Sequence, residues 1–381
     1  MQSTLCSDGA RNLGRDCLNS VLNSCVGNFF AQSTDATGKS KDAEFVFADI
    51  AAAIVKMGGA KFVFLVTLDG PSVCRKVLRL VEQRLPQIFG QRCCTHAWHL
   101  LLQDIVTFEF KHVLSRIVRL LKFVVNHTSI LVIFQSLVVK KAPCTLMRIF
   151  LMFCIFQTTT AGAAGLLAII ESRFASNFYA AQRVLRDKPL LEQLFTSAAL
   201  ADWLAKYRPK AGELNLRAEF TYLKDEMIFF PRFWKKLFTY VNFTEFMVKG
   251  LRKADTDSPN LHLMLPAFEL ARIQCYKIAR EAVAADPDLY VPDLALKVDA
   301  AFAKREADIV TPLARAAAFV DPLTAYTTPQ PTIAGGFMAL AEVMKKYYQE
   351  HADPAATSTA AMAQMVAFRE GTGEFFSNGN G

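Results

Sequence analysis

The sequence predicts a mixed α/β sheet followed by a large all-helical region. Strand and helix patterns alternate before Asp104, whereas after it apolar residues recur at helical spacing. The chain has 381 residues, of which 52% are hydrophobic and 20% are charged. This composition excludes a disordered protein, and the length allows two or three domains with their own cores.

Six segments of the α/β region have recognisable patterns. Residues 62–68 are uniformly apolar, as in a strand buried on both faces. Residues 42–57 carry an apolar stripe at helical spacing, between a capping Asp42 and the stop signal Gly58-Gly59. In chain order we expect a hairpin of strands at 17–25 and 28–34, a helix at 42–57, a strand at 62–68, a helix at 73–85 and an edge strand at 92–94.

The later part of the chain reads as helical throughout. Residues 108–126 form an amphipathic pattern in which Arg116, Arg119 and Lys122 share one face. From Phe174 onward the helical pattern continues, with breaks expected at Pro209, Pro231, Pro259, Pro287 and Pro292. The tail 371–381 is rich in Gly and Asn, and we expect it to be frayed.

The net charge of +8 is concentrated in residues 1–150, which hold 18 Lys and Arg against 10 Asp and Glu. A basic segment attracts polyanions, with nucleic acid as the first candidate, although a solvated basic face is the simpler interpretation. The nine cysteines are odd in number and scattered, and the N-terminus has no charged segment followed by an apolar one. These features predict a reducing compartment and no signal peptide.

Two aspartates each lie at the end of a predicted strand and directly before a glycine. Asp8 closes Leu5-Cys6-Ser7-Asp8-Gly9, and Asp69 follows the apolar run 62–68 and precedes Gly70. Carboxylates at the ends of neighbouring strands hold divalent metal ions for attack on a phosphodiester, because hard cations prefer oxygen ligands. Asp-Gly is also a common turn dipeptide. Both interpretations stay open on the residues alone.

Two further motifs have a structural and a functional interpretation each. The spacing of Cys93 and His96 would supply two of the four ligands of a closed zinc site, with His99 as the one further candidate nearby. A buried Cys and a hydrogen-bonded His at a helix start is the alternative. The pair Arg173-Phe174 would grip a phosphate and stack on an exposed base, or would belong to the core.

Four stretches, taken in order, carry a resemblance to a known family. They are Ser7-Asp8-Gly9 with 27–36, then 66–70 with 86–89 and 93–104, then 172–176, and finally 312–317 with Asp321-Pro322. With this ordered set the chain resembles the hAT superfamily of DNA transposases, most closely the branch catalogued as domain of unknown function 659. The single motifs are loose, but the set spans nearly the whole chain.

The resemblance implies an RNase H-like mixed sheet interrupted by a large all-helical insertion. Asp8 and Asp69 match the first two catalytic acids of the family, which would hold Mg²⁺ or Mn²⁺ for strand cleavage and transfer. The DNA contacts of the family match Cys93, His96, Arg173 and Phe174, with the Phe ring stacked on a flipped base. The implied partner is double-stranded DNA, in a nucleus and as a homo-oligomer, with no small-molecule cofactor.

Three departures from the family predict a catalytically incomplete, truncated core. The sequence ends at Gly381, before the region that carries the third acid and the dimer interface of the family. It begins seven residues before Asp8, with no zinc-finger module and little of a first strand. Leu68 separates Thr67 from Asp69, where the family runs Thr straight into Asp. An extra residue turns a side chain to the opposite face of a strand unless a bulge absorbs it.

An apolar segment interrupts the family pattern. Residues 146–170 are long enough to span a bilayer, but a Gln-Thr-Thr-Thr patch lies mid-span, so we expect no membrane span. The family runs directly from the preceding helix to the Arg-aromatic motif, whereas here residues 142–165 intervene. We interpret them as a retained intron or a genomic insertion that is translated in frame.

The predicted organisation has four parts: an RNase H-like core at 1–127, an apolar connection at 128–171, an all-helical insertion-type domain at 172–370 and a disordered tail at 371–381. The predicted function is that of a transposase-derived protein with a nucleic-acid-binding core that is catalytically incomplete. A non-catalytic DNA-binding or protein-interaction module is the second hypothesis. A membrane-attached protein that uses 146–170 is the third.

Overall fold

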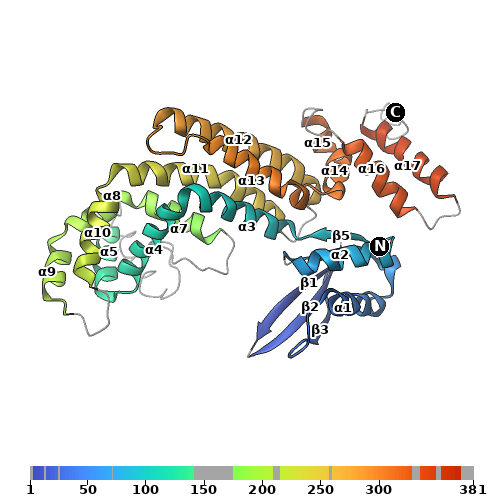
Figure 1. The fold of residues 1–381 in the computed structure, drawn as a ribbon, viewed down its shortest axis with the longest axis horizontal. Helices are drawn as coiled ribbons and strands as arrows, with labels where there is room; N and C mark the ends of the chain where they lie inside the picture. Colours follow the sequence, from blue (N-terminus) through green and yellow to red (C-terminus); the bar gives the residue numbers. More distant parts are fainter. Residues whose placement is uncertain are drawn as a thin grey trace. The chain divides into compact units, whose positions relative to one another are not determined.

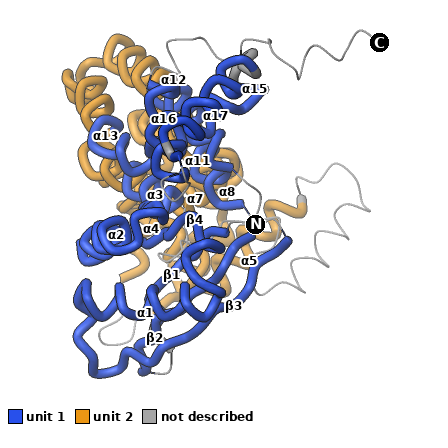
Figure 2. The backbone as a smooth tube through the Cα atoms, turned by 90° about the vertical axis from the view of Figure 1, so that its right-hand side faces the viewer, with its two compact units in different colours: residues 1–101, 249–272, 302–381 blue, residues 102–248, 273–301 orange. Residues whose placement is uncertain are grey.

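The chain divides into two compact units, each discontinuous in sequence (Figures 1 and 2). The sheet unit comprises residues 1–101, 249–272 and 302–381, and the helical unit comprises 102–248 and 273–301. The computed structural model describes residues 3–12, 14–24, 26–70, 72–140, 175–208, 215–256, 260–327, 335–348 and 353–369. These units are defined by their compactness, whereas the domain limits expected from the sequence follow the organisation of a family. Those limits therefore stay a prediction.

A five-stranded mixed sheet lies in the first 92 residues (Figure 1). Its strands are β1 (Ser3–Asn12), β2 (Arg15–Ser24), β3 (Gly27–Asp35), β4 (Val63–Leu68) and β5 (Phe89–Arg92), in the order β3-β2-β1-β4-β5. β2 is antiparallel to β1 and β3, whereas β4 is parallel to both β1 and β5. These are the order and directions of an RNase H-like sheet, so the fold class, a mixed sheet followed by helices, is confirmed.

Two helices cover one face of the sheet. α1 (Ala43–Lys56) begins at Asp42, whose Oδ1 accepts the Phe45 N–H at 2.9 Å, and it ends before two glycines with positive φ. α2 (Ser72–Arg84) follows β4 after a short connection. The core between helices and strands includes Leu5, Leu18, Val46, Ile50, Ile54, Val66, Leu68, Val77 and Val81. The helices and the hairpin expected from the sequence are therefore present, to within two or three residues at their ends.

Later segments of the chain cover the opposite face of the sheet. Leu65 and Phe89 pack with Leu313 of α14 (Pro312–Val320), together with residues of η4 (Leu261–Leu263) and α16 (Gly336–Tyr347). Lys346 of α16 lies over the Phe89 ring, 4.2 Å from its centroid. The sheet unit also contains α15 (Pro322–Thr327) and α17 (Pro354–Arg369). The sheet is thus buried on both faces at β4 and β5, as the uniformly apolar run predicts.

Two strands differ from their predicted form. The sequence predicts little of a first strand and a turn at Asp8, but β1 is ten residues long and continues through Asp8 to Asn12. The antiparallel strand β2 pairs with β1 from Thr4 to Asn12 and so continues the strand past Asp8 and Gly9. The edge strand β5 runs over Phe89–Arg92 and not 92–94, because Cys94 already begins α3 (Cys94–Ile105).

The described residues of the helical unit are mostly helical. The described helices are η2 (Val106–Phe110), α4 (Lys111–Val125), α5 (Thr128–Lys140), α7 (Ser176–Arg186), α8 (Lys188–Thr196), α9 (Ala198–Lys206), α10 (Leu216–Leu223) and η3 (Lys224–Ile228). Four longer helices contribute residues to both units: α3, α11 (Pro231–Ala254), α12 (Met264–Ala285) and α13 (Leu294–Ile309). Pro231 starts α11, in accord with the preference of proline for a first helical turn.

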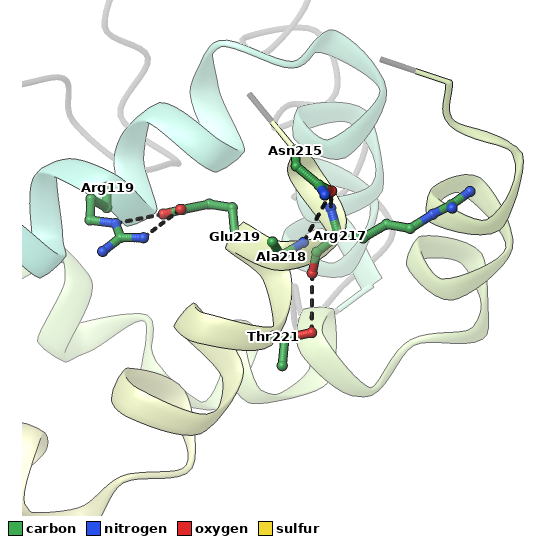
Figure 3. Close-up of polar contacts among 6 residues, drawn as sticks. All are labelled: Arg119, Asn215, Arg217, Ala218, Glu219 and Thr221. Atoms are coloured by element: carbon green, nitrogen blue, oxygen red, sulfur yellow. Dashed lines mark hydrogen bonds and ion pairs between the residues drawn. The ribbon is translucent and has the colours of Figure 1, made fainter. Parts of the chain in front are cut away.

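Ion pairs connect α4 to the helices packed against it. Arg119 donates from Nε and Nη2 to the two carboxylate oxygens of Glu219 on α10, at 2.8 and 2.6 Å (Figure 3). Glu219 is only 7% exposed, and Asn215 caps the start of its helix by accepting from the N–H groups of residues 217 and 218. Arg116 pairs with Glu226 at 3.3 Å. Two of the three cations that the sequence places on one helix face therefore hold this unit together.

No single helix among the described residues is long and apolar enough to cross a membrane. The helical segments Cys94–Val125 and Thr128–Val139 are together long and apolar enough, but they meet at an angle of 95°. The apolar segment 146–170, the suspected insertion 142–165 and the tail 371–381 lie outside the described residues.

Candidate functional site

The two aspartates of the sequence are neighbours in the sheet: Asp8 lies within the central strand β1, and Asp69 follows the last residue of the adjacent strand β4. In the parallel pair of β1 and β4 the last matched residues are Ser7 and Leu68, so Asp8 and Asp69 are the next residue on each strand. Leu68 belongs to the core under α1 and α2. Because side chains alternate along a strand, the aspartates belong to the opposite face. The structure therefore brings together two carboxylates that are 61 positions apart in sequence.

A bulge in β4 keeps the side chains of Asp8 and Asp69 on the same face of the sheet. The register between β1 and β4 shifts between Ser3, which faces Val63, and Thr4, which faces Leu65, so that Phe64 has no partner. A bulge inserts one residue into one strand and reverses the side-chain alternation beyond it. The extra Leu68 therefore does not turn Asp69 away from Asp8.

The two carboxylates influence each other electrostatically. The pKa of Asp8 is raised, first by partial desolvation and then by the neighbouring charge of Asp69. The Gly9 backbone N–H and His96 oppose this and lower it. Two neighbouring like charges are the arrangement that a divalent cation stabilises.

His96 holds the Asp69 carboxylate in place. It lies in the first turn of α3, and its Nδ1 is 2.8 Å from Asp69 Oδ1, which also accepts the Gly70 N–H at 2.6 Å. A Cβ atom at Gly70 would lie 2.0 Å from His96 Nε2, so any other residue at this position requires the imidazole to move. The helix-start interpretation of Cys93 and His96 thus agrees with the geometry, and His96 acts as an orienting group for Asp69.

The cysteines near the site are protonated at neutral pH. Burial and the neighbouring Cys93 raise the pKa of Cys6 to about 11, and burial raises the pKa of Cys93, which Asp69 raises further. Within the described part of the chain, no three His, Cys, Asp or Glu side chains are arranged to hold a metal ion. The structure therefore gives the zinc interpretation no support.

An ion pair that the sequence analysis did not single out lies next to Gly70. Arg92, at the end of β5, donates to the Gly70 carbonyl at 3.2 Å and forms a close ion pair with Asp308 of α13. Its side chain is 10% exposed. Asp308 lies 216 positions away in sequence, so no local spacing connects it with Arg92. Arg92 thus holds the Gly70 connection through its carbonyl, and it neutralises the Asp308 carboxylate.

The donor atoms of the two aspartates suit a hard divalent cation. Mg²⁺ is commonly held by one or two carboxylates, with waters or phosphate oxygens completing its shell. Asp8 and Asp69 supply two carboxylates, and the raised pKa of Asp8 reflects first its partial desolvation and then repulsion by Asp69, which a cation would relieve. Of the other predicted site residues, Arg173 and Phe174 lie outside the described residues. The roles of Cys93 and His96 as DNA contacts stay predictions.

One comparison with known proteins identifies the segment that contains this site. Residues 3–125 match the family described as a domain of unknown function, DUF659. The match runs from the start of β1 to the last residue of α4 and includes Asp8, Asp69, Cys93 and His96. No curated protein matches the chain. The matched segment thus agrees with the branch named by the resemblance, over about a third of the chain.

Proposed function

We propose that this protein derives from an hAT-like DNA transposase and that its sheet unit binds double-stranded DNA. The observation that carries the proposal is that Asp8, within β1, neighbours Asp69, the residue that follows the parallel strand β4. The RNase H-like strand order, the DUF659 match and the positive charge of residues 1–150 support it. The nucleus is the compartment that this function requires, and the partner class allows a homo-oligomer on DNA.

In this proposal Asp8 and Asp69 hold Mg²⁺ or Mn²⁺ through their carboxylate oxygens. The bound ion would supply the charge stabilisation and the activated oxygen nucleophile that phosphodiester cleavage needs. His96 and the Gly70 N–H engage one oxygen of Asp69 and leave Oδ2 for the cation. Arg92 fixes the connection that carries Asp69 by its bond to the Gly70 carbonyl.

We further propose that the chain by itself binds DNA without cutting it. The described residues bring two carboxylates together at this site, whereas the family chemistry uses three acids. Asp308 reaches the neighbourhood, but its charge is taken up by Arg92. A two-carboxylate centre positions a cation and a phosphate, yet lacks the ligand that would hold a second ion.

The test measures DNA binding and DNA cleavage separately. Fluorescence anisotropy with labelled duplex DNA should show binding that weakens steeply with salt, since each neutralised phosphate releases counterions. Incubation with Mn²⁺ should give no more nicking than the Asp8→Asn and Asp69→Asn variants give. Absence of salt-dependent binding would overturn the DNA-binding proposal. If the wild type nicks DNA and both variants lose this activity, the chain is not catalytically incomplete but a nuclease.

A second candidate function is a non-catalytic DNA-binding module that no longer uses a cation. The observation that favours it is the ligand count, which stops at two among the described residues. EDTA separates the candidates. A retained cation site predicts tighter binding to DNA in Mg²⁺ than in EDTA for the wild type only, whereas a metal-free module predicts equal binding in both buffers for wild type and Asp8→Asn.

A further inference from the structure

The outer face of α2 carries a basic surface that no part of the described chain neutralises. We define this α2 surface as Arg75, Lys76 and Arg79, all of them exposed. The opposite side of the helix buries Val77, Leu78 and Val81 against the sheet. Over the residues that the structure describes, none of the three cations has an ion pair, hydrogen bond or ring contact.

The other basic side chains of this part of the sheet unit are engaged. Arg84, at the end of the same helix, makes two hydrogen bonds of 2.8 Å to Glu44 of α1. Glu82, the nearest acid on α2, lies 3.3 Å from Lys346 and accepts the Gly90 N–H. The charge of the α2 surface is therefore left for a partner.

The N-terminal end of α2 lies near the carboxylate pair, and the α2 surface is on the side of the helix that faces away from the sheet. α2 starts three residues after Asp69. The pKa of Cys74, in the first turn of α2, is raised first by burial and then by Asp69 and Asp8. The beginning of the helix thus lies within electrostatic reach of both aspartates. Arg75 and Arg79, four residues apart, are about 6 Å apart along the helix axis, so the charge extends from this end along the helix.

We propose that the α2 surface contacts the phosphate backbone of the DNA duplex whose phosphodiester approaches Asp8 and Asp69. The proposal rests on the DNA-binding function proposed above and names the residues that carry it. A bound phosphate would otherwise be repelled by the two carboxylates. Three cations on the adjoining helix offset that repulsion, and they bind without reading sequence because phosphate contacts carry no base information.

The composition of the helix favours nucleic acid over a membrane surface. A helix that lies on a lipid surface presents large apolar side chains next to its cations. Among the described residues the large exposed apolar side chains include Val26, Phe30 and Val55, but none from α2. All the large apolar residues of α2 face the core or its margin. The exposed side chains of α2 are all polar or charged.

The experiment compares two triple variants of the full chain. One is Arg75→Gln, Lys76→Gln and Arg79→Gln. The matched control removes three exposed cations of other helices: Lys111→Gln, Lys122→Gln and Arg280→Gln. Glutamine keeps the helix propensity, so both variants should melt at the wild-type temperature. Binding to labelled duplex DNA is measured over a range of salt concentrations for each protein, and binding to vesicles of anionic lipid serves as a second probe.

The expected result is a loss of affinity on the order of 10²-fold for the α2 variant near 0.1 M salt, with a slope of log K against log salt that is smaller by about 2.7. The control should bind as the wild type does. If the wild type does not bind DNA, both the proposed function and this inference are wrong. If the wild type binds and the α2 variant binds equally well, or the control loses as much, the function stands and the α2 surface is overturned. Vesicle binding that only the α2 variant loses, with DNA binding unchanged, would also overturn it.

Discussion

Helices α2 and α4 each carry three cations within two turns; two of the three on α4 are paired with acids, whereas among the described residues none of the three on α2 is. On α4, Arg119 is paired with Glu219 and lies 3.6 Å from the centroid of the Tyr222 ring. Arg116 is paired with Glu226 and faces the Phe230 ring at 5.8 Å. On α2, the three cations of the α2 surface have no such partner among the described residues. One basic face stabilises the fold, and the other remains available for binding.

The comparison teaches that spacing along a helix does not reveal whether a charge is available. The acids that pair with α4 lie 100 and 110 positions later in the chain. They reach α4 through the tertiary packing of α10 and η3 against it. Only a structure shows which of two similar basic faces is paired with acidic side chains.

The largest effect on stability is expected from Arg119→Met. The substitution keeps the packing volume but leaves Glu219, which is 7% exposed, without its partner. Breaking a buried pair costs roughly 3–5 kcal/mol, and because Arg119 itself is 41% exposed we expect about 2 kcal/mol. Chemical denaturation measures the change. The matched Arg79→Met on α2 should stay within about 0.5 kcal/mol of the wild type. Equal losses in both variants would show that α2 also uses its cations structurally.

A smaller effect is expected from Gly70→Ala, next to the start of α2. The new methyl group would displace the His96 imidazole from Asp69. We expect a loss of about 1 kcal/mol, at the low end for overpacking, because the imidazole is 24% exposed and has room to swing.

Gly9→Ala on β1 is the control for this change, since no atom lies within 4 Å of its new methyl group. The His96 ring signals in an NMR spectrum should shift in the Gly70 variant and not in the Gly9 variant. Unchanged His96 signals in Gly70→Ala would contradict the close approach of Gly70 and the imidazole.

Much of the fold follows from local sequence signals, and the site follows in part. The helix at 42–57 and the strand at 62–68 have caps, stops and apolar periods within the segment, so their prediction needs no partner. The end of β1 was misplaced because Asp8-Gly9 has the composition of a turn, whereas pairing with β2 carries the strand to Asn12. The Arg92–Asp308 pair and the bulge at Phe64 depend on contacts between distant segments, so no local pattern indicates them.

The smallest effect on stability is expected from Asp8→Asn, and it depends on pH. The pKa of Asp8 lies above its ordinary value of 3.8 in the folded protein, so the folded chain holds this proton more tightly than the unfolded chain. The free energy of unfolding therefore falls as pH rises from 3.8 through the raised pKa, and the loss persists above it. We expect the variant to be more stable than the wild type at neutral pH and equally stable below 3.8.

Asp35→Asn is the control with the opposite sign. Its carboxylate accepts hydrogen bonds from Thr37, including the backbone N–H at 2.9 Å, and these lower its pKa. The variant should lose stability at neutral pH and regain parity with the wild type in acid. Thermal melts over a series of pH values measure both variants. An Asp8→Asn variant that is less stable at neutral pH would contradict the raised pKa of Asp8, and with it the desolvation and the repulsion by Asp69 that raise it.

The central claim is that Asp8 and Asp69 form one cation-binding centre in a DNA-binding sheet. Isothermal titration calorimetry with Mn²⁺, in the absence of DNA, tests it most directly. The account predicts binding to the wild type that is lost in both Asp8→Asn and Asp69→Asn, while the Asp35→Asn control binds as the wild type does. Binding that survives either substitution unchanged, or no binding to the wild type, would contradict it.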